Sequence, residues 1–304
     1  MTILSGNNIH MPKPCVLAMG KFESIHIGHR ALISEMKKLA QPGLATALVV
    51  FEPHPYRVLF DPSYKPLYTR LEREHLAREQ RVDYLLEYQF GHSFAALSPK
   101  DFCRKIFEEL QAKIVVVGED YRFGHKRIGT TDTLRQAAKG YNAQVHVMPH
   151  HGVHQNGDDF AKSGADKTST SLIRELLSSY RLSEAERLLG DSFFVICDVT
   201  QQTVRDSGFP TIKLAVPEEK FLPPEGVYMS RLFVDARIYD GLSVIGLRPG
   251  EDGVSSPRRV EMDVTDAWFN SYVYHKLRST RGYYGGDMCG KQVRIELSRH
   301  LLFP

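Results

Sequence analysis

Residues 15–34 read CVLAMGKFESIHIGHRALIS, and the expected architecture of the N-terminal half rests on this stretch. It begins with an apolar run of strand length and continues into a helical pattern in which Ile33, Met36 and Leu39 fall on one face. A second apolar run, ATALVVF at 45–51, is rich in valine. A buried strand, a helix and another buried strand in this order predict a parallel sheet.

The same alternation of strand-like and helical segments continues along the chain. Further strand-like runs are DYLLEY at 83–88, IVVVG at 114–118 and QVHVM at 144–148, with helical patterns starting near Leu71 and Pro99. The segment therefore predicts an α/β domain of the Rossmann-like kind, with helices on both faces of a parallel sheet.

The polar segment 150–168 interrupts this alternation. It is longer than most connections in a compact domain, so we expect a flap that is either mobile or functional. Two short helices are expected after it, at 169–178 and 183–189, and Gly190 is expected to end the second. These features predict a first domain that spans residues 1–190.

The remaining residues, 191–304, change in character. Short β-branched segments are separated by Gly and Pro turns: FFVICDVT at 193–200, GVYMSRLFV at 226–234, GLSVIGL at 241–247 and KQVRIEL at 291–297. The pattern predicts a second, smaller antiparallel β domain, either a barrel or a sandwich.

The composition favours a globular protein over a nucleic-acid-binding or membrane protein. The 304 residues suffice for two domains, and a hydrophobic fraction of 42% with 25% charged residues is typical of a globular protein. The net charge of +3 is too small for a nucleic-acid binder. The four cysteines are far apart, so reduced thiols are expected. No apolar run approaches the roughly 18 residues that span a bilayer, and no secretory pattern opens the chain, so we expect a cytoplasmic protein without a membrane partner.

The segment His26-Ile27-Gly28-His29 follows the first strand, where a helix is expected to begin. Backbone N–H groups and the helix dipole attract phosphate at such a place, and two imidazoles would add hydrogen-bond donors. The alternative is an ordinary strand-to-helix turn with two surface histidines. The position directly after the strand favours a phosphate site.

Residues 20–29, GKFESIHIGH, resemble the first motif of the adenylyltransferase module of the prokaryotic bifunctional riboflavin kinase/FAD synthetase family, which is close to G-x-F-D-G-x-H-x-G-H. Two positions depart from the family: Glu23 replaces an Asp and Ser24 replaces a Gly. The resemblance implies catalytic roles for His26 and His29. It implies ATP binding by Gly20, Phe22, Glu23 and Gly28.

Two further elements resemble the flavin side of the same family. FEPHP at 51–55 is identical to the family's element, and VGEDYRFG at 117–124 is similar to V-G-E-D-F-R-F-G. The resemblance implies FMN binding by Glu52, Pro53, His54, Pro55, Glu119, Asp120 and Phe123. The alternatives are a rigid proline turn for the first element, and an acidic loop over a buried aromatic side chain for the second.

The last element, Ser169-Thr170-Ser171-Leu172-Ile173-Arg174, is similar to the family's S-S-T-x-I-R. The resemblance implies that Ser169, Thr170 and Ser171 bind ATP and that Arg174 is catalytic, facing the phosphates. Hydroxyl side chains at a helix start are also ordinary N-caps, and this remains the alternative. Four elements in family order cover roughly residues 14–189.

The resemblance implies an FAD synthetase that transfers AMP from ATP to FMN with Mg²⁺. The FMN phosphate is mostly ionised at neutral pH, so no general base is needed, and catalysis depends on alignment and charge neutralisation. Two alternatives stay open. One is an adenylyltransferase for another small phosphate acceptor, and the other is a non-catalytic flavin or nucleotide sensor.

The second domain resembles the family's riboflavin kinase barrel at GFPT (208–211), LPPEGVY (222–228), IGLRP (245–249) and GDMCGK (286–291). The resemblance places Thr211 and Glu261 at the kinase site. Residues 195–205 replace the family's glycine-rich loop without any glycine, Lys213 replaces an Asn, and 267–284 is an extra stretch. Because close approach to phosphates needs glycine, we expect this kinase site to be degenerate.

Overall fold

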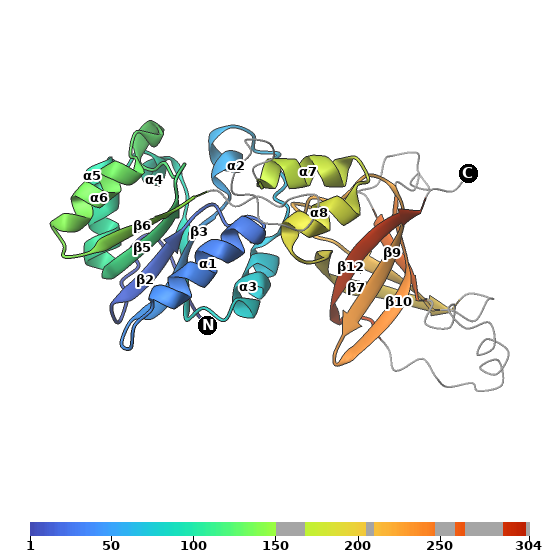
Figure 1. Ribbon diagram of the computed structural model, residues 1–304. Coiled ribbons are helices and arrows are strands. Elements are labelled where there is room, and N and C mark those ends of the chain that lie inside the picture. The colour runs from blue at the N-terminus through green and yellow to red at the C-terminus, as the bar shows by residue number, and fades with distance from the viewer. Residues whose placement is uncertain (150–167, 205–209, 247–258, 265–287, 302–304) are drawn as a thin grey trace. The chain divides into compact units, whose positions relative to one another are not determined.

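The computed structural model describes residues 1–149, 168–204, 210–246, 259–264 and 288–301 (Figure 1). The expected flap, up to residue 167, and the stretch 267–284 lie outside these ranges. The chain divides into two compact units, Met1–Thr170 and Ser171–Pro304. The two helices that the sequence assigned to the end of the first domain therefore group with the second unit.

A six-stranded parallel sheet forms the centre of the first unit, in the order β1-β4-β3-β2-β5-β6. Its strands are β1 (Thr2–Ser5), β2 (Cys15–Met19), β3 (Ala45–Glu52), β4 (Tyr84–Gln89), β5 (Ala112–Gly118) and β6 (Gln144–Met148). Five of the six confirm predicted strands. The sequence analysis missed β1, because its four residues carry too little pattern and its place depends on pairing with β4.

Helices cover both faces of this sheet, as predicted (Figure 1). They are α1 (Ile27–Leu39), α2 (Pro55–Leu59), α3 (Arg70–Glu79), α4 (His92–Ala95), α5 (Pro99–Arg104) with its π-helical extension Lys105–Glu109, the 3-10 turn His125–Arg127, and α6 (Thr131–Lys139). Successive side chains of a strand point to opposite faces, so Cys15, Leu17 and Met19 of β2 join Phe102 and Ile106 in one core. Helix α1 packs on β2 and β5.

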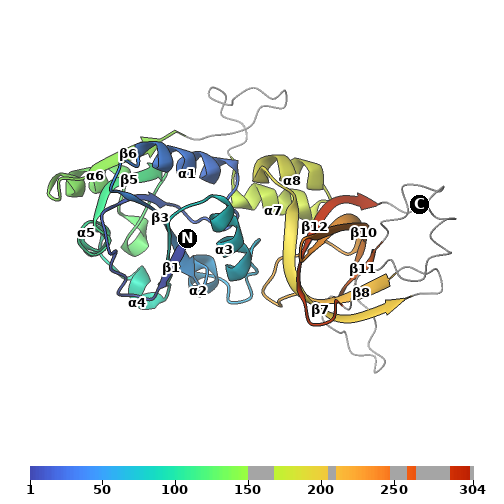
Figure 2. The ribbon, with the colours of Figure 1, turned by 90° about the horizontal axis from the view of Figure 1, so that it is seen from below.

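A closed antiparallel barrel forms the second unit, in the order β10-β11-β8-β7-β12-β9, and Figure 2 shows its strands as a ring. Its elements are α7 (Thr170–Ser178), α8 (Leu182–Leu189), β7 (Phe193–Val204), β8 (Pro210–Ala215), β9 (Gly226–Val234), β10 (Arg237–Gly246), β11 (Arg259–Val264) and β12 (Gln292–Leu301). Closure decides between the two expected architectures in favour of the barrel. Helix α8 ends at Gly190, whose φ of 71° is left-handed, as the sequence predicted.

None of the helices in the described part of the chain is long and apolar enough to cross a membrane.

Candidate active site

Three of the predicted motifs follow three neighbouring strands of the parallel sheet. The segment with His26 and His29 follows β2, FEPHP ends β3 and begins α2, and VGEDYRFG continues β5. Strand β2 lies between β3 and β5. From β2 the chain adds β3 and β4 on one side of the sheet, and then β5 and β6 on the other, so the strand order reverses between β2 and β5. Ligands of open α/β sheets bind at the carboxyl ends of the strands beside such a reversal. The fold therefore brings these three motifs to one edge of the sheet.

The two histidines lie at the start of α1. His26 is the N-cap residue, and its Nδ1 accepts a hydrogen bond of 3.4 Å from the backbone N–H of His29. The two imidazole rings stack with their centroids 3.9 Å apart, and the ring of Phe22 lies 4.8 Å from that of His29. This geometry fixes both rings beside the first N–H groups of the helix, where anions bind.

His29 is held in its neutral form. Burial, followed by the electrostatic repulsion that a proton on His29 would meet from His26 and Lys21, keeps the pKa of His29 well below its ordinary value. Among the residues that the structure describes, no group forms a hydrogen bond with the buried Nδ1 of His29. A buried polar atom without a protein partner is typical of a site that a ligand completes.

The backbone of the same motif adopts an uncommon conformation. Phe22 and Ile25 have φ values of 43° and 41°, in the left-handed region that side chains other than glycine rarely adopt. Both side chains are fully buried, and this packing holds the turn. Strained residues of this kind cluster at functional sites.

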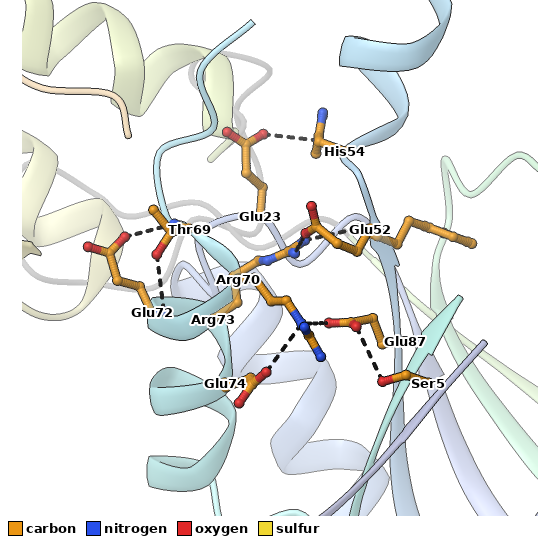
Figure 3. Close-up of polar contacts among 11 residues, drawn as sticks. Ser5, Glu23, Glu52, His54, Thr69, Arg70, Glu72, Arg73, Glu74 and Glu87 are labelled. Carbon is orange, nitrogen blue, oxygen red and sulfur yellow. Dashed lines mark hydrogen bonds and ion pairs between the residues drawn. The ribbon is translucent and has the colours of Figure 1, made fainter. Parts of the chain in front are cut away.

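Glu23 lies in the motif GKFESIHIGH, but its carboxylate is directed toward FEPHP and the segment after α2. It accepts hydrogen bonds from the Tyr64 hydroxyl and the Leu67 backbone N–H, and it lies beside His54 (Figure 3). The resemblance implied ATP binding by Glu23, and contact with ATP stays a prediction.

The FEPHP element forms a turn that caps α2. His54 is the N-cap residue, with Nδ1 accepting from the Tyr56 N–H at 3.2 Å, and Pro55 occupies the first turn. Glu52 forms an ion pair with the buried Arg73, whose guanidinium also donates to the Phe51 carbonyl (Figure 3). Pro53 follows Glu52 through a cis peptide bond.

Three apolar side chains beside this turn are exposed: Tyr56 at 46%, Leu59 at 43% and Phe60 at 73%. These three side chains were not among the predicted site residues, although their proximity to FEPHP in the sequence was a usable signal. Exposed apolar side chains next to a predicted flavin motif offer contact surface for a planar aromatic ring.

The third motif divides into exposed and buried parts. Glu119 and Asp120 are exposed, whereas Phe123 is 4% exposed and packs against Phe102 at 5.0 Å between ring centroids. A Cβ added at Gly129 would lie 2.8 Å from the Phe123 ring, so Gly129 is required for this close packing. The arrangement favours an acidic loop over a buried aromatic side chain, and contact of these three residues with FMN stays a prediction.

The fourth motif is divided between the two units. Thr170 lies in the first unit, with its Oγ1 3.3 Å from the Ser24 hydroxyl, so Ser24, where the family has Gly, connects the two motifs. Ser169, in the same unit, is partly buried. Ser171 and Arg174 belong to the second unit, where the Arg174 guanidinium lies 4.6 Å from the centroid of the Phe221 ring. Their approach to the histidines stays a prediction.

The predicted kinase residues lie on adjacent strands of the barrel. Glu261 on β11 is directly opposite Lys213 on β8, and Thr211 is buried two residues before Lys213. Residues 195–204, expected in place of the glycine-rich loop, form part of strand β7, whose register with β8 shifts between Val199 and Gln201, and Val195 and Val199 are buried. Directly opposite residues share one face of a sheet, so Lys213 and Glu261 are neighbours.

The described residues contain no group of three His, Cys, Asp or Glu side chains arranged to hold a metal ion. Mg²⁺ in nucleotide sites is bound mainly by phosphate oxygens and water, with one or two carboxylates from the protein.

Comparison with known families identifies both units. A family model described as FAD synthetase matches residues 8–163, and a model described as riboflavin kinase matches residues 195–301. A bifunctional riboflavin kinase/FMN adenylyltransferase from Listeria monocytogenes is 33% identical over 242 residues, which cover 76% of this chain and 72% of the relative. A protein of the same description from Bacillus subtilis is 30% identical over 294 residues, covering 91% of this chain and 89% of the relative.

Among solved structures, a crystal structure described as a macrolide-efflux protein from Streptococcus pneumoniae is similar to this chain with a TM-score of 0.76. It covers 99% of this chain and 91% of that chain at 22% sequence identity. This similarity shows a shared fold.

Proposed function

From the premise that the chain belongs to the FAD synthetase family and carries a riboflavin kinase domain, we propose that its first unit transfers AMP from ATP to the phosphate of FMN, producing FAD and pyrophosphate. The observation that carries this proposal is the placement of a buried, stacked histidine pair at the start of α1, between the FEPHP turn and the β5 loop.

The reaction forms a bond between an FMN phosphate oxygen and the α-phosphorus of ATP, and it breaks the bond from that phosphorus to the pyrophosphate oxygen. The nucleophilic oxygen is already ionised at neutral pH, because a phosphate monoester loses its second proton near pH 6. The protein therefore has to align the two phosphates and neutralise the charge that develops on pyrophosphate.

In this proposal, His26 and His29 stabilise the developing negative charge as neutral hydrogen-bond donors. Because His26 Nδ1 accepts the N–H of His29, a neutral His26 carries its proton on Nε2, which is the atom left to donate to phosphate. The backbone N–H groups at the start of α1 add further donors. In this proposal ATP enters as its Mg²⁺ complex, and Ser169, Thr170, Ser171 and Arg174 contact the phosphates.

The alternatives differ in substrate or in turnover. The FEPHP turn with its exposed aromatic side chains supports FMN over another small phosphate acceptor. A sensor that binds without turnover would keep the same geometry. The decisive experiment incubates the full chain with FMN, ATP and Mg²⁺ and follows FAD and pyrophosphate by chromatography. FAD formation is the expected result, and its absence despite measurable FMN binding would favour the sensor.

For the second unit, we propose that phosphorylation of riboflavin is weak. Lys213 lies opposite Glu261, so an ammonium group accompanies the predicted base and would repel an approaching Mg²⁺. The match to a riboflavin kinase model supports descent of this barrel from an active kinase. The cytoplasmic location stays a prediction.

A further inference from the structure

The carboxylate of Glu23 connects three segments that are far apart in the sequence. Its Oε1 accepts the Leu67 backbone N–H at 2.8 Å, and both oxygens lie 3.0 Å from the Tyr64 hydroxyl, which donates to them. Its Oε2 lies 3.2 Å from His54 Nε2, with an alignment short of a regular hydrogen bond, so this contact is chiefly electrostatic. Figure 3 shows Glu23 facing His54 across this gap.

Because the Glu23 carboxylate is buried, it requires these contacts to remain stable in the folded protein. The side chains of Glu23 and His54 are 3% and 6% exposed. A carboxylate removed from water is costly unless donors surround it, and hydrogen bonds to a charged acceptor are stronger than those between neutral groups. The position of Glu23 therefore determines the positions of the groups that donate to it.

The orientation of His54 follows from its two ring nitrogens. Nδ1 accepts the N–H of Tyr56 as the cap of α2, so the neutral ring carries its proton on Nε2, the atom that faces Glu23. The ring also stacks on Tyr64, with centroids 5.1 Å apart. His54 thus caps α2 through Nδ1 and faces Glu23 through Nε2. The face of its ring stacks on Tyr64.

The groups held in this way lie on the flavin side of the site. His54 belongs to FEPHP, and α2 presents the exposed Tyr56 and Phe60. Residues 64–67 lie in the segment between α2 and α3. The Glu23 carboxylate reaches this side through its hydrogen bonds with Tyr64 and Leu67 and its contact with His54.

We propose that Glu23, although it lies within the phosphate motif, is a positioning residue for FMN: its carboxylate holds His54 and residues 64–67 and thereby fixes the flavin-binding turn against the nucleotide site. This inference rests on the proposed adenylyl transfer to FMN. It differs from the sequence expectation, in which Glu23 contacts ATP, and the two assign the residue to different substrates.

The experiment compares Glu23→Gln with wild-type protein in steady-state FAD formation. Glutamine keeps the length of the side chain and an acceptor for Leu67, but its amide presents N–H groups where the carboxylate faces the proton on His54. We expect KM for FMN to rise about tenfold or more, while KM for ATP changes less than about twofold. Glu74→Gln on α3 is the matched control: this partly buried carboxylate pairs with the exposed Arg70, and its loss should leave both values unchanged.

A pair of variants at His54 separates its two contacts. Asparagine can supply an acceptor at the place of Nδ1 and keeps the cap of Tyr56, whereas glutamine can supply a donor at the place of Nε2 and keeps the contact with Glu23. If positioning by Glu23 governs FMN binding, His54→Gln should bind FMN at least about fivefold more tightly than His54→Asn. Equal or reversed affinities would contradict the inference.

The two proposals fail in different ways. If wild-type protein forms no FAD, the proposed adenylyl transfer is wrong, and FMN binding by fluorescence quenching still tests Glu23. If wild-type protein forms FAD but Glu23→Gln raises KM for ATP and leaves KM for FMN unchanged, the inference is overturned and direct nucleotide contact is favoured. A general loss of folded protein would lower the signal for both substrates equally, without a selective change in KM for FMN.

Discussion

At the residue scale, the stacked pair His26 and His29 combines two requirements that usually oppose one another. A phosphate site gains from positive charge, yet two protonated imidazoles 3.9 Å apart would repel each other. Burial and this repulsion keep the pKa of His29 low, so the site relies on oriented N–H donors rather than on a fixed positive charge there.

Removal of the His29 ring should therefore reduce catalysis more than binding. We expect His29→Ala to lower kcat for FAD formation by about 10² or more, because a preorganised donor to developing charge is lost. Arg174→Ala should give a similar loss if its guanidinium reaches the departing pyrophosphate. Chromatographic assay of FAD checks both, with the exposed His92→Ala as control. Unchanged turnover in His29→Ala would contradict the assignment of this motif.

The low pKa of His29 also predicts a pH dependence of stability. Because the folded state resists protonation of this ring, the unfolded state binds the proton more readily below the ordinary value of 6.5. The contribution of His29 to stability should be fully present above about pH 6.5 and should fall as the pH is lowered from there. Urea unfolding between pH 5 and pH 8 tests this.

In the same titration, the free energy of unfolding of a His29→Asn variant should decline less at low pH than that of wild-type protein. His92→Ala should show the wild-type decline. If His29→Asn and wild-type protein show the same decline in the free energy of unfolding, the ring does not resist protonation in the folded state.

At the scale of elements, the start of α3 shows how a short motif fixes a helix beside the site. Thr69 and Glu72 form a reciprocal capping box: the Thr69 hydroxyl accepts the Glu72 N–H, and the Glu72 carboxylate accepts the Thr69 N–H at 2.7 Å. Both residues are buried, so water cannot replace these bonds. The helix then presents Arg70 and Arg73 to Glu87 and Glu52 (Figure 3).

Loss of this cap should destabilise the first unit. We expect Thr69→Ala to lower the free energy of unfolding by about 1 to 2 kcal/mol, as is usual for an N-cap threonine. Ser34→Ala, an exposed substitution within α1, should change it by less than about 0.5 kcal/mol. Urea denaturation followed by circular dichroism measures both, and equal values for the two variants would show that the cap contributes nothing.

At the scale of the whole molecule, the proposal of a weak kinase rests on a difference between the two units. The first unit keeps its motifs at the edge of the sheet, whereas in the barrel Lys213 is the cross-strand neighbour of Glu261. The buried β7 side chains Val195 and Val199 occupy the segment that the resemblance assigned to a glycine-rich loop.

The intact protein should accordingly produce little FMN from riboflavin and ATP. Lys213→Asn should increase FMN formation, because it removes the positive charge that opposes Mg²⁺ beside Glu261, whereas the exposed Lys113→Asn in the first unit should not. Chromatography of FMN measures the rates. Rapid, Mg²⁺-dependent FMN formation by wild-type protein that disappears in Glu261→Ala would show that the barrel is an active kinase.

The sequence by itself determined the two kinds of architecture and the residues of the first motif, because strand and helix periods and strand-to-helix turns are local patterns. Only the tertiary structure decided that β1 completes the sheet, that the β domain closes into a barrel, that Phe123 packs in the core and that Glu23 faces His54. These features depend on pairing and packing between residues distant in the chain. The Glu23 carboxylate has no local signal for its partners, since Tyr64 and Leu67 lie 41 and 44 residues farther along the chain and approach it only in the folded protein.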